Sequence, residues 1–344
     1  MKRTIAGVTC ALAVAGANAQ SSVTLYGLVD GGIQYLTNAN KAGKSQWSTA
    51  SGSYLPSRFG FRGSEDLGAG YSAFFSLENG FNVNDGTVAT SSSFFNRFAL
   101  VGLETPYGSV SLGRQGSVQY DKTVFYEPLY YANYSQLSLN AAPISIFKLN
   151  NTVKYTSKSY GGFDVEAQYG FGQQIAGKPT AGRYFGGAIE YIYGGLSTRV
   201  LHEETRGSVT GTVDQSSLVD KRTSVAAVYI YNPFSLFADW TRVTGDLQLS
   251  PRGSVYSVGA SYLPKPDIRL VAEAGMYKRT ALSGTPKLFD FMAQYLLSKR
   301  TSIYLIGGYM INAGNSNYGV VYTTSTPTPG QTQLGLTLGI DHRF

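Results

Sequence analysis

Side chains that could act as nucleophiles, general bases or metal ligands are scarce among these 344 residues. There is a single cysteine, Cys10, and there are two histidines, His202 and His342. His342 follows Asp341 directly, and neighbouring residues of a β-strand point to opposite faces, so this pair is not expected to form a proton relay. His202 stands in the acidic run LHEETR (201–206), where we expect a solvated position near a loop. The sequence therefore predicts no catalytic residue, no metal site and no cofactor.

The ionisable residues that remain are charges spread over the whole chain, 28 Lys and Arg against 21 Asp and Glu. Basic residues that recognise nucleic acid gather in a patch or stripe, and these do not, so we expect no nucleic-acid partner. The chemistry open to such a chain is electrostatic: steering of small charged solutes.

The first residues, MKRTIAGVTCALAVAGANAQ, have the features of a secretory signal peptide. Lys2 and Arg3 precede an apolar run (5–16), and small residues follow up to Ala19, which predicts a signal peptide over 1–19. The apolar run is too short to span a bilayer. Cleavage would remove Cys10 and lower the formal charge from +7 to +5.

The elements that must position the charges are predicted from a period of two. FDVEAQY (163–169), YSVGASY (256–262) and IRLVAEAGM (268–276) each place apolar residues on one face and polar or small ones on the other. FFNRFALVGLE (94–104) and SIYLIGGYMI (302–311) alternate less cleanly. This alternation predicts half-apolar β-strands throughout the chain.

The connections between these strands are of two kinds. Seven short turns, such as TPYGS (105–109) and PKPD (264–267), alternate with eight longer polar segments, which bound about sixteen strands. Tyr and Phe recur near strand ends, as in the aromatic girdles of membrane barrels, and the polar face carries more charge than a protein core holds. Only a closed barrel with lipid outside and water inside accommodates both faces. We predict an all-β, 16-stranded antiparallel transmembrane barrel that forms a single domain over 20–344.

Several longer motifs support this interpretation and indicate a family. These motifs are SSVTLYGLVD (21–30), SRFGFRGSEDLG (57–68), NRFALVGLETPYGSVSLGRQ (96–115), VKYTSKSYGGF (153–163) and GIDHRF (339–344). In them the chain resembles Gram-negative general porins of the β-proteobacterial type. The resemblance implies a homotrimer in the outer membrane, long extracellular loops, short periplasmic turns, a third loop folded into the channel, and passive diffusion of small hydrophilic solutes.

The longest segment without strand character, 116–148, is the third long loop, and the resemblance makes it the constriction loop. Its acids Asp121 and Glu127 are the candidates for the loop side of the constriction. The loop reads FYEPLYY (125–131), where enterobacterial porins carry a stretch like PEFGG.

Strand parity predicts the wall that faces this loop. Arg58 and Arg62 share a face opposite Phe59 and Phe61, Arg97 is expected opposite Phe98 and Leu100, and Lys154 lies between apolar neighbours. We therefore expect a field across the channel between a basic wall and acidic groups. The predicted constriction comprises the bases Arg58, Arg62, Arg97 and Lys154, and the acids Glu78, Asp121 and Glu127. An excess of basic groups predicts a mild anion preference. Outward basic residues are also expected to meet phosphates of lipopolysaccharide.

The last residues, LTLGIDHRF (336–344), keep the strand alternation to the end of the sequence. Leu336, Leu338, Ile340, His342 and Phe344 share one parity, which we expect to face lipid. This strand must pair with VTLYGLVD (23–30), because an open sheet edge in hydrocarbon leaves backbone groups unsatisfied. The resemblance implies that Phe344 is also a recognition signal for the outer-membrane assembly machinery.

Three other functions compete with a general porin. A solute-specific channel would use the aromatic residues of 116–148 as a binding track. An outer-membrane enzyme would need a base and a nucleophile that the sequence does not offer. A secreted carbohydrate-binding β-protein would be stable in water without detergent, which separates it from a barrel.

Overall fold

The computed structural model of the protein describes residues 22–139, 143–144, 146–280, 282–322 and 327–344, so the predicted signal peptide lies outside the described residues. Nearly all of the regular secondary structure in the described residues is β-strand. Two short helices, α1 (Val118–Thr123) and the 3-10 helix η1 (Gln136–Ser138), both fall within 116–148. The strands are β1 (Ser22–Leu36), β2 (Gln46–Ser51), β3 (Arg58–Gly68), β4 (Tyr71–Gly80), β5 (Phe98–Thr105), β6 (Gly108–Gly116), β7 (Lys148–Ser157), β8 (Phe163–Gly170), β9 (Tyr184–Tyr193), β10 (Leu196–Arg206), β11 (Val209–Thr210), β12 (Val213–Asp214), β13 (Val219–Tyr231), β14 (Phe234–Gly245), β15 (Gly253–Lys265), β16 (Ile268–Arg279), β17 (Lys287–Leu296), β18 (Thr301–Ile311) and β19 (Gln333–Arg343).

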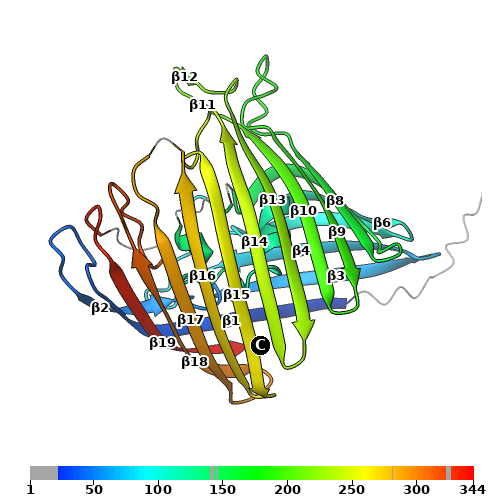
Figure 1. Ribbon diagram of the computed structural model, residues 1–344. Helices are drawn as coiled ribbons and strands as arrows, with labels where there is room; N and C mark the ends of the chain where they lie inside the picture. The colour runs from blue at the N-terminus through cyan, green and yellow to red at the C-terminus, as the bar shows by residue number, and fades with distance from the viewer. Residues whose placement is uncertain (1–21, 140–142, 145, 281, 323–326) are drawn as a thin grey trace, which may run out of the picture.

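Seventeen of the strands form one closed antiparallel barrel, in which β3 to β10 and β13 to β19 pair in chain order, β10 pairs with β13, and β19 pairs with β1 (Figure 1). Strands β11 and β12 form a separate two-stranded sheet between β10 and β13. The sheet has 17 strands, of which β2 is not a separate position in the barrel. Strand β2 pairs with Gly31–Leu36 of β1, and β3 pairs with Ser22–Leu28 of the same strand. Strands β2 and β3 therefore occupy a single barrel position beside β1, which an inward turn at 52–57 divides in two. Sixteen barrel positions result, which confirms the predicted fold.

The end of the chain closes this barrel. Phe344 exchanges backbone hydrogen bonds of 3.0 and 3.1 Å with Gly27, beyond the last paired residue of β19. Leu338, Ile340 and Phe344 are 63 %, 50 % and 47 % exposed on the outer face, which confirms the predicted parity. A Cβ at Gly27 would lie 2.2 Å from the Phe344 ring, so this glycine provides the space that the terminal ring occupies.

Most strands confirm the predicted faces, and β5 does not. Glu78, which points inward and is 4 % exposed, lies directly opposite Phe98 in the sheet, and Val101 and Leu103 are exposed on the outside. The prediction that Phe98 and Leu100 face outward is therefore wrong. The stretch FFNRFALVGLE contains apolar residues at both parities, so its pattern does not distinguish the faces.

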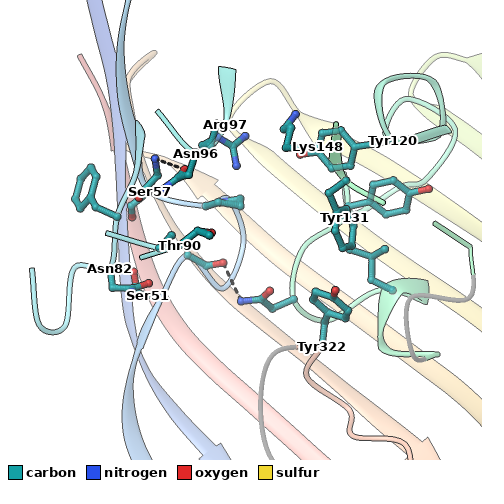
Figure 2. Close-up of a pocket in the computed structure, with 18 of the residues that line it drawn as sticks. Ser51, Ser57, Asn82, Thr90, Asn96, Arg97, Tyr120, Tyr131, Lys148 and Tyr322 are labelled. Carbon is teal, nitrogen blue, oxygen red and sulfur yellow. Dashed lines mark hydrogen bonds between the residues drawn. The ribbon is translucent and has the colours of Figure 1, made fainter. Parts of the chain in front are cut away.

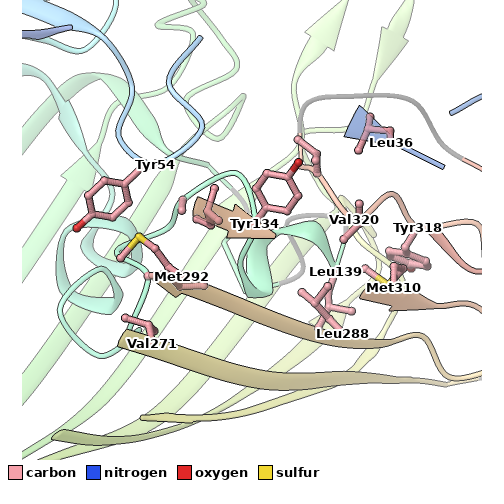
Figure 3. Packing of buried hydrophobic residues seen from close by; sticks show 14 of the residues in the cluster. Leu36, Tyr54, Tyr134, Leu139, Val271, Leu288, Met292, Met310, Tyr318 and Val320 are labelled. Carbon is pink, nitrogen blue, oxygen red and sulfur yellow. The ribbon is translucent and has the colours of Figure 1, made fainter. Parts of the chain in front are cut away.

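The inner face of β15–β18 departs from the simple barrel pattern in another way. It carries apolar side chains, because two loops fold inward and cover it (Figure 3). Residues of 116–148 and of the segment between β18 and β19 pack there against the wall. The buried cluster includes Leu129, Tyr134 and Leu139 from the first loop, Tyr318, Val320 and Val321 from the second, and Val255, Val271, Leu288, Met292, Ile306 and Met310 from the strands. No described helix is long and apolar enough to cross a membrane, a finding that does not bear on crossing by β-strands.

Candidate functional site: the channel interior

A cavity of about 690 Å³ lies inside the barrel between the β3–β6 wall and the inward loop. Ser57 and Asn96 lie on one side of it, and Tyr120, Tyr131 and Tyr322 lie on the other (Figure 2). Three of the residues that line it are basic: Arg97, Arg114 and Lys148. Among the described residues that line it there is no Asp or Glu. The cavity is therefore a polar and aromatic space with basic side chains and without carboxylates.

Local backbone features bring the three basic residues to this cavity. Arg97 lies just before β5, where strand alternation does not apply, and Lys148 is the first residue of β7. Arg114 follows Gly113, at which φ is 126° and the register between β6 and β7 shifts by a bulge. A Cβ at Gly113 would lie 2.2 Å from the carbonyl oxygen of Ala99, so this geometry requires glycine. The bulge turns Arg114 toward Asn96 and Asn150, to which its guanidinium donates at 2.9 and 2.6 Å.

Two of the predicted basic residues share one carboxylate. Arg97 Nε lies 2.6 Å from Glu78 Oε1, and Arg58 Nε lies 3.8 Å from Glu78 Oε2. The hydroxyl of Tyr26 also donates to Glu78 at 2.9 Å. These three predicted residues thus form one cluster on the wall with a net charge of +1, rather than two rows that face each other.

Lys148 has no comparable partner. Among the described residues, its Nζ forms no ion pair with a carboxylate and donates no hydrogen bond. It lies 4.0 Å from the centre of the Phe98 ring and 4.1 Å from that of Tyr120, the geometry of a cation–π interaction. The inward position of Phe98, which the sequence pattern did not predict, therefore helps to hold this lysine at the cavity.

Lys154 and Asp121 meet at another place, beneath α1. Lys154 Nζ lies 2.6 Å from Asp121 and 3.2 Å from Glu166, and Lys122 lies 2.5 Å from Glu190. The helix is fixed there because Ser117 caps its N-terminus and Val118 packs against Ala188 and Leu201. The structure thus pairs Lys154 with a predicted loop acid, but in a network that holds the loop to the β7–β10 wall.

Glu127 lies outside both of these clusters. It is fully buried beside Glu273 and near Asp290 and Arg269, and it accepts the Tyr131 N–H at 2.7 Å. Burial raises the pKa of the Glu127 carboxyl. Glu127 is therefore part of a sealed acidic cluster on the side of the loop that faces away from the cavity.

The described residues contain no group of three or more His, Cys, Asp or Glu arranged to hold a metal ion.

An ion pair with no exposed atoms fixes the middle of the loop. Arg199 on β10 lies 2.8 Å from Asp239 on β14, and both side chains are 0 % exposed. The same guanidinium donates to Thr123 of the loop at 2.5 Å and lies 4.9 Å from the Tyr126 ring. Two wall strands and the loop are held together at this point.

Arg62 remains apart from both clusters. It is exposed on the inner face of β3 toward the short-turn end of the barrel, with its guanidinium 5.1 Å from the Tyr26 ring. Of the seven predicted residues, Arg97 lines the cavity, and Arg58 and Glu78 adjoin it. Sequence reasoning did not include Arg114 and Lys148 in the constriction. Gly113 within a strand is a signal for the bulge that redirects Arg114, whereas nothing in the sequence distinguishes Lys148.

Comparisons with known proteins are consistent with this architecture. A family model described as Gram-negative porin matches residues 7–315. The chain is 28 % identical over 361 aligned positions to outer membrane porin protein 32 of Delftia acidovorans, with both chains covered completely. It is 29 % identical to an outer membrane porin of Bordetella pertussis, over 81 % of this chain and 70 % of the relative.

Solved structures show the same fold. An anion-selective porin from Comamonas acidovorans superposes with a TM-score of 0.79 at 26 % identity, covering 94 % of this chain and all of that one. OmpF of Salmonella typhi superposes with a TM-score of 0.69 at 17 % identity, covering 94 % and 97 % of the two chains.

Proposed function

This chain belongs to the Gram-negative porin family, and on that premise we propose that its channel prefers small anions. The protein is an outer-membrane barrel that forms a water-filled channel for passive diffusion of small hydrophilic solutes. The proposed preference for anions rests on the residues that line the channel of this chain.

One observation carries the proposal: the cavity beside the loop is lined by Arg97, Arg114 and Lys148, with no carboxylate among the described lining residues. Glu78 partly offsets Arg97, but among the described residues Arg114 donates to a carbonyl and an amide oxygen and to no carboxylate. An anion entering this space is stabilised by cations in a setting with less screening than bulk water. A related porin described as anion-selective supports the same direction.

The predicted residues take different parts in this proposal. Loop 116–148 narrows the channel, and Arg58, Arg97 and Glu78 form the charged wall opposite it. Lys154 and Asp121 position the loop, Glu127 anchors it from behind, and Arg62 acts on solutes nearer the periplasm. Residues 1–19 act as the signal peptide, and 20–344 form the mature domain.

The test is the zero-current potential in a planar bilayer with a tenfold KCl gradient. Replacing two arginines with Gln (R97Q/R114Q) should move the zero-current potential toward cation preference. The shift should correspond to a roughly several-fold decrease in the anion-to-cation permeability ratio. The matched control K41Q/K44Q removes two exposed charges from the first outer loop and should leave the potential unchanged. An unchanged potential in R97Q/R114Q would disprove the assignment.

A solute-specific channel is the second candidate, and the aromatic side of the cavity favours it. Tyr120 and Tyr131 are stacked with ring centres 6.3 Å apart, and Phe147 and Tyr322 make an edge contact beside them at 5.5 Å. Such a surface suits a flat anionic solute. Single-channel current that saturates with one such solute at low concentration would establish this function, and linear conductance would exclude it.

The remaining partners follow from family membership. We propose a homotrimer that contacts outer-membrane lipids and lipopolysaccharide and that has no enzymatic activity. Phe344 serves as the signal for the assembly machinery, so deleting it should reduce the amount of inserted protein more than it changes single-channel conductance. A deletion variant that inserts normally would contradict that role.

A further inference from the structure

The turn at 52–57, between β2 and β3, contains more residues than the sheet can pair. Ser51 pairs with Gly31 of β1 and Arg58 pairs with Leu28, so two residues of β1 face a run of six, and four residues are in excess. A β-bulge commonly inserts one extra residue into a strand, so an excess of four leaves the sheet. Three residues of this turn are at most 3 % exposed, which places it inside the barrel rather than on the lipid side.

Asp30 of β1, which is 0 % exposed, fixes the shape of the turn. Its carboxylate accepts the backbone N–H groups of Tyr54 at 3.2 Å and Leu55 at 2.8 Å, and the hydroxyl of Tyr304 on β18 donates to it at 2.5 Å. The Asp30 N–H donates to the Ser57 hydroxyl at 2.9 Å, and the Asp30 carbonyl accepts from that hydroxyl at 3.1 Å. A buried carboxylate with several donors holds them in one arrangement, so the turn is a fixed part of the inner wall.

Asn133 of the inward loop is bound to this turn. Its backbone N–H donates to the Ser53 carbonyl at 3.0 Å, and its side-chain amide donates to the Gly52 carbonyl at 3.1 Å. The Asn133 carbonyl accepts the Tyr322 N–H at 2.9 Å and the Ser138 hydroxyl at 3.1 Å. The turn, the loop and the segment between β18 and β19 therefore meet at one residue, and we call this contact the Asn133 junction.

The junction and the other attachments of the loop lie on different sides of the barrel. Arg199 on β10 donates to Thr123, and β10 is eight positions from β1 in a barrel of sixteen, which is halfway round. Between these two points, Arg269 on β16 donates to the Pro128 carbonyl at 2.6 Å. The loop is thus a bridge across the lumen, with the cavity on one side of it and the apolar cluster on the other.

The junction also borders the channel cavity. Gly52 and Ser57 of the turn, together with Asn133 and Tyr322, line this space. Ser51 and Ser57 lie on one side of it and Tyr322 on the other (Figure 2). A displacement of the turn or of Asn133 therefore changes the free cross-section of the cavity directly.

We propose that the inward turn 52–57 is a second element that narrows the channel, and that Asn133 and Asp30 are its positioning residues. Asp30 holds the turn inside the barrel, and Asn133 fastens loop 116–148 to it. Without the junction, the loop keeps its attachments at Arg199 and Arg269, and the part beyond them moves away from the β1–β3 wall. This inference concerns the size of the opening and is independent of the proposed anion preference.

The main test removes the four excess residues, 53–56, so that β2 and β3 can continue as one strand. Single-channel conductance is measured in about 1 M KCl, where charges act over only about 3 Å, and liposome swelling is measured with neutral sugars of graded size. The deletion should raise conductance about 1.5-fold or more and admit larger sugars, because pore diameter limits both. The matched control deletes residues 40–43, four exposed residues of the first outer loop, and should behave as the wild type does.

Point variants test the two positioning residues. N133A removes one hydrogen bond of the junction and should raise conductance in the same direction by a smaller factor. Its control N82A removes a cavity-lining amide that donates to Thr87 of its own loop, and should conduct as the wild type does. D30N should widen the channel although Asp30 is not among the described residues that line the cavity.

A reversible link serves if the deletion variant fails to fold. Cys10 is the single cysteine and lies in the predicted signal peptide, so S53C/N133C introduces two thiols into a mature chain that has none. The oxidised form of this variant should conduct as the wild type does, and the reduced form should conduct more. A role in stability alone would lower the unfolding midpoint without this reversible change in current.

The outcomes separate this inference from the proposed ion preference. Wild-type conductance and size limit in the deletion variant and in N133A would overturn it, as would equal currents from oxidised and reduced S53C/N133C. An equal change in the control deletion would also overturn it. An unchanged zero-current potential in R97Q/R114Q would disprove the anion assignment and leave these conductance results as they stand.

Discussion

The two sides of loop 116–148 differ in how their charges are placed. On the cavity side, Arg97, Arg114 and Lys148 line an accessible space without a lining carboxylate. On the sealed side, Glu127, Glu273 and Asp290 are buried against an apolar cluster. The loop separates cations that can meet a solute from acids that cannot. The difference teaches that ion preference in such a channel depends on which charges remain accessible, and not on the number of each sign.

The largest expected effect comes from opening the sealed side. Arg199→Ala breaks the buried pair with Asp239 and removes the bond to Thr123. Leaving one buried charge unpaired costs about 3–5 kcal/mol, so we expect a large drop in the unfolding midpoint and a noisier open channel as the loop loosens. Thermal unfolding in detergent and single-channel recordings measure both. The double variant R199M/D239L removes both charges and should recover most of the stability; failure to recover would place the effect elsewhere.

A second prediction uses pH on the same side. Burial raises the pKa of Glu127 above its ordinary value of 4.5, so the folded protein holds a proton that the unfolded chain releases. The contribution of this carboxyl to stability is therefore fully present below pH 4.5 and is lost as the pH rises above it, by at most about 1.4 kcal/mol per pH unit. Glu127→Gln keeps the neutral form and should make the curve of unfolding midpoint against pH less steep. Parallel curves for wild type and variant would contradict the role of Glu127.

A third prediction compares the two sides directly. Arg114→Glu changes an accessible charge and should lower the anion-to-cation permeability ratio by about tenfold, equivalent to about 1.4 kcal/mol. Glu127→Gln alters a carboxyl on the sealed side and should leave the ratio unchanged. Zero-current potentials in a KCl gradient measure both variants. Equal shifts would mean that the sealed acids do act on permeating ions.

The smallest expected effect belongs to a charge on neither side. Lys158 pairs with Glu104 near a short turn, where both side chains are more than a third exposed. Lys158→Gln should cost less than about 1 kcal/mol in unfolding free energy and leave ion preference unchanged. Unfolding and bilayer measurements on this variant set the baseline for the others, and a shift in its potential would show that remote charges matter.

Much of the fold could be predicted from the sequence, because each feature depends on local pattern. Alternation in FDVEAQY and YSVGASY predicts which residues of β8 and β15 face inward and which face outward. The alternation of short turns with long loops predicts the number of strands and the direction in which each runs. Pairing of the terminal strand with the first follows from the cost of an open edge in lipid. In β5 the same reasoning failed, since apolar residues occur at both parities there.

Less of the candidate site could be predicted. Parity correctly placed Arg58, Glu78 and Lys154 on the inner face. It could not show that Glu78 is shared by two arginines, or that Lys154 pairs with Asp121 beneath α1. Those contacts join residues far apart in the chain.

The sequence by itself determined a closed sixteen-position barrel, the face on which most strand residues lie, and the last strand's place beside the first, because these follow from a period of two and from hydrogen bonding in lipid. Only the tertiary structure decided which charges stay accessible. That depends on the path of loop 116–148, which buries Glu127 and brings Lys148 over the Phe98 and Tyr120 rings. A loop without a repeating pattern takes its path from packing against distant strands, and no local rule describes it.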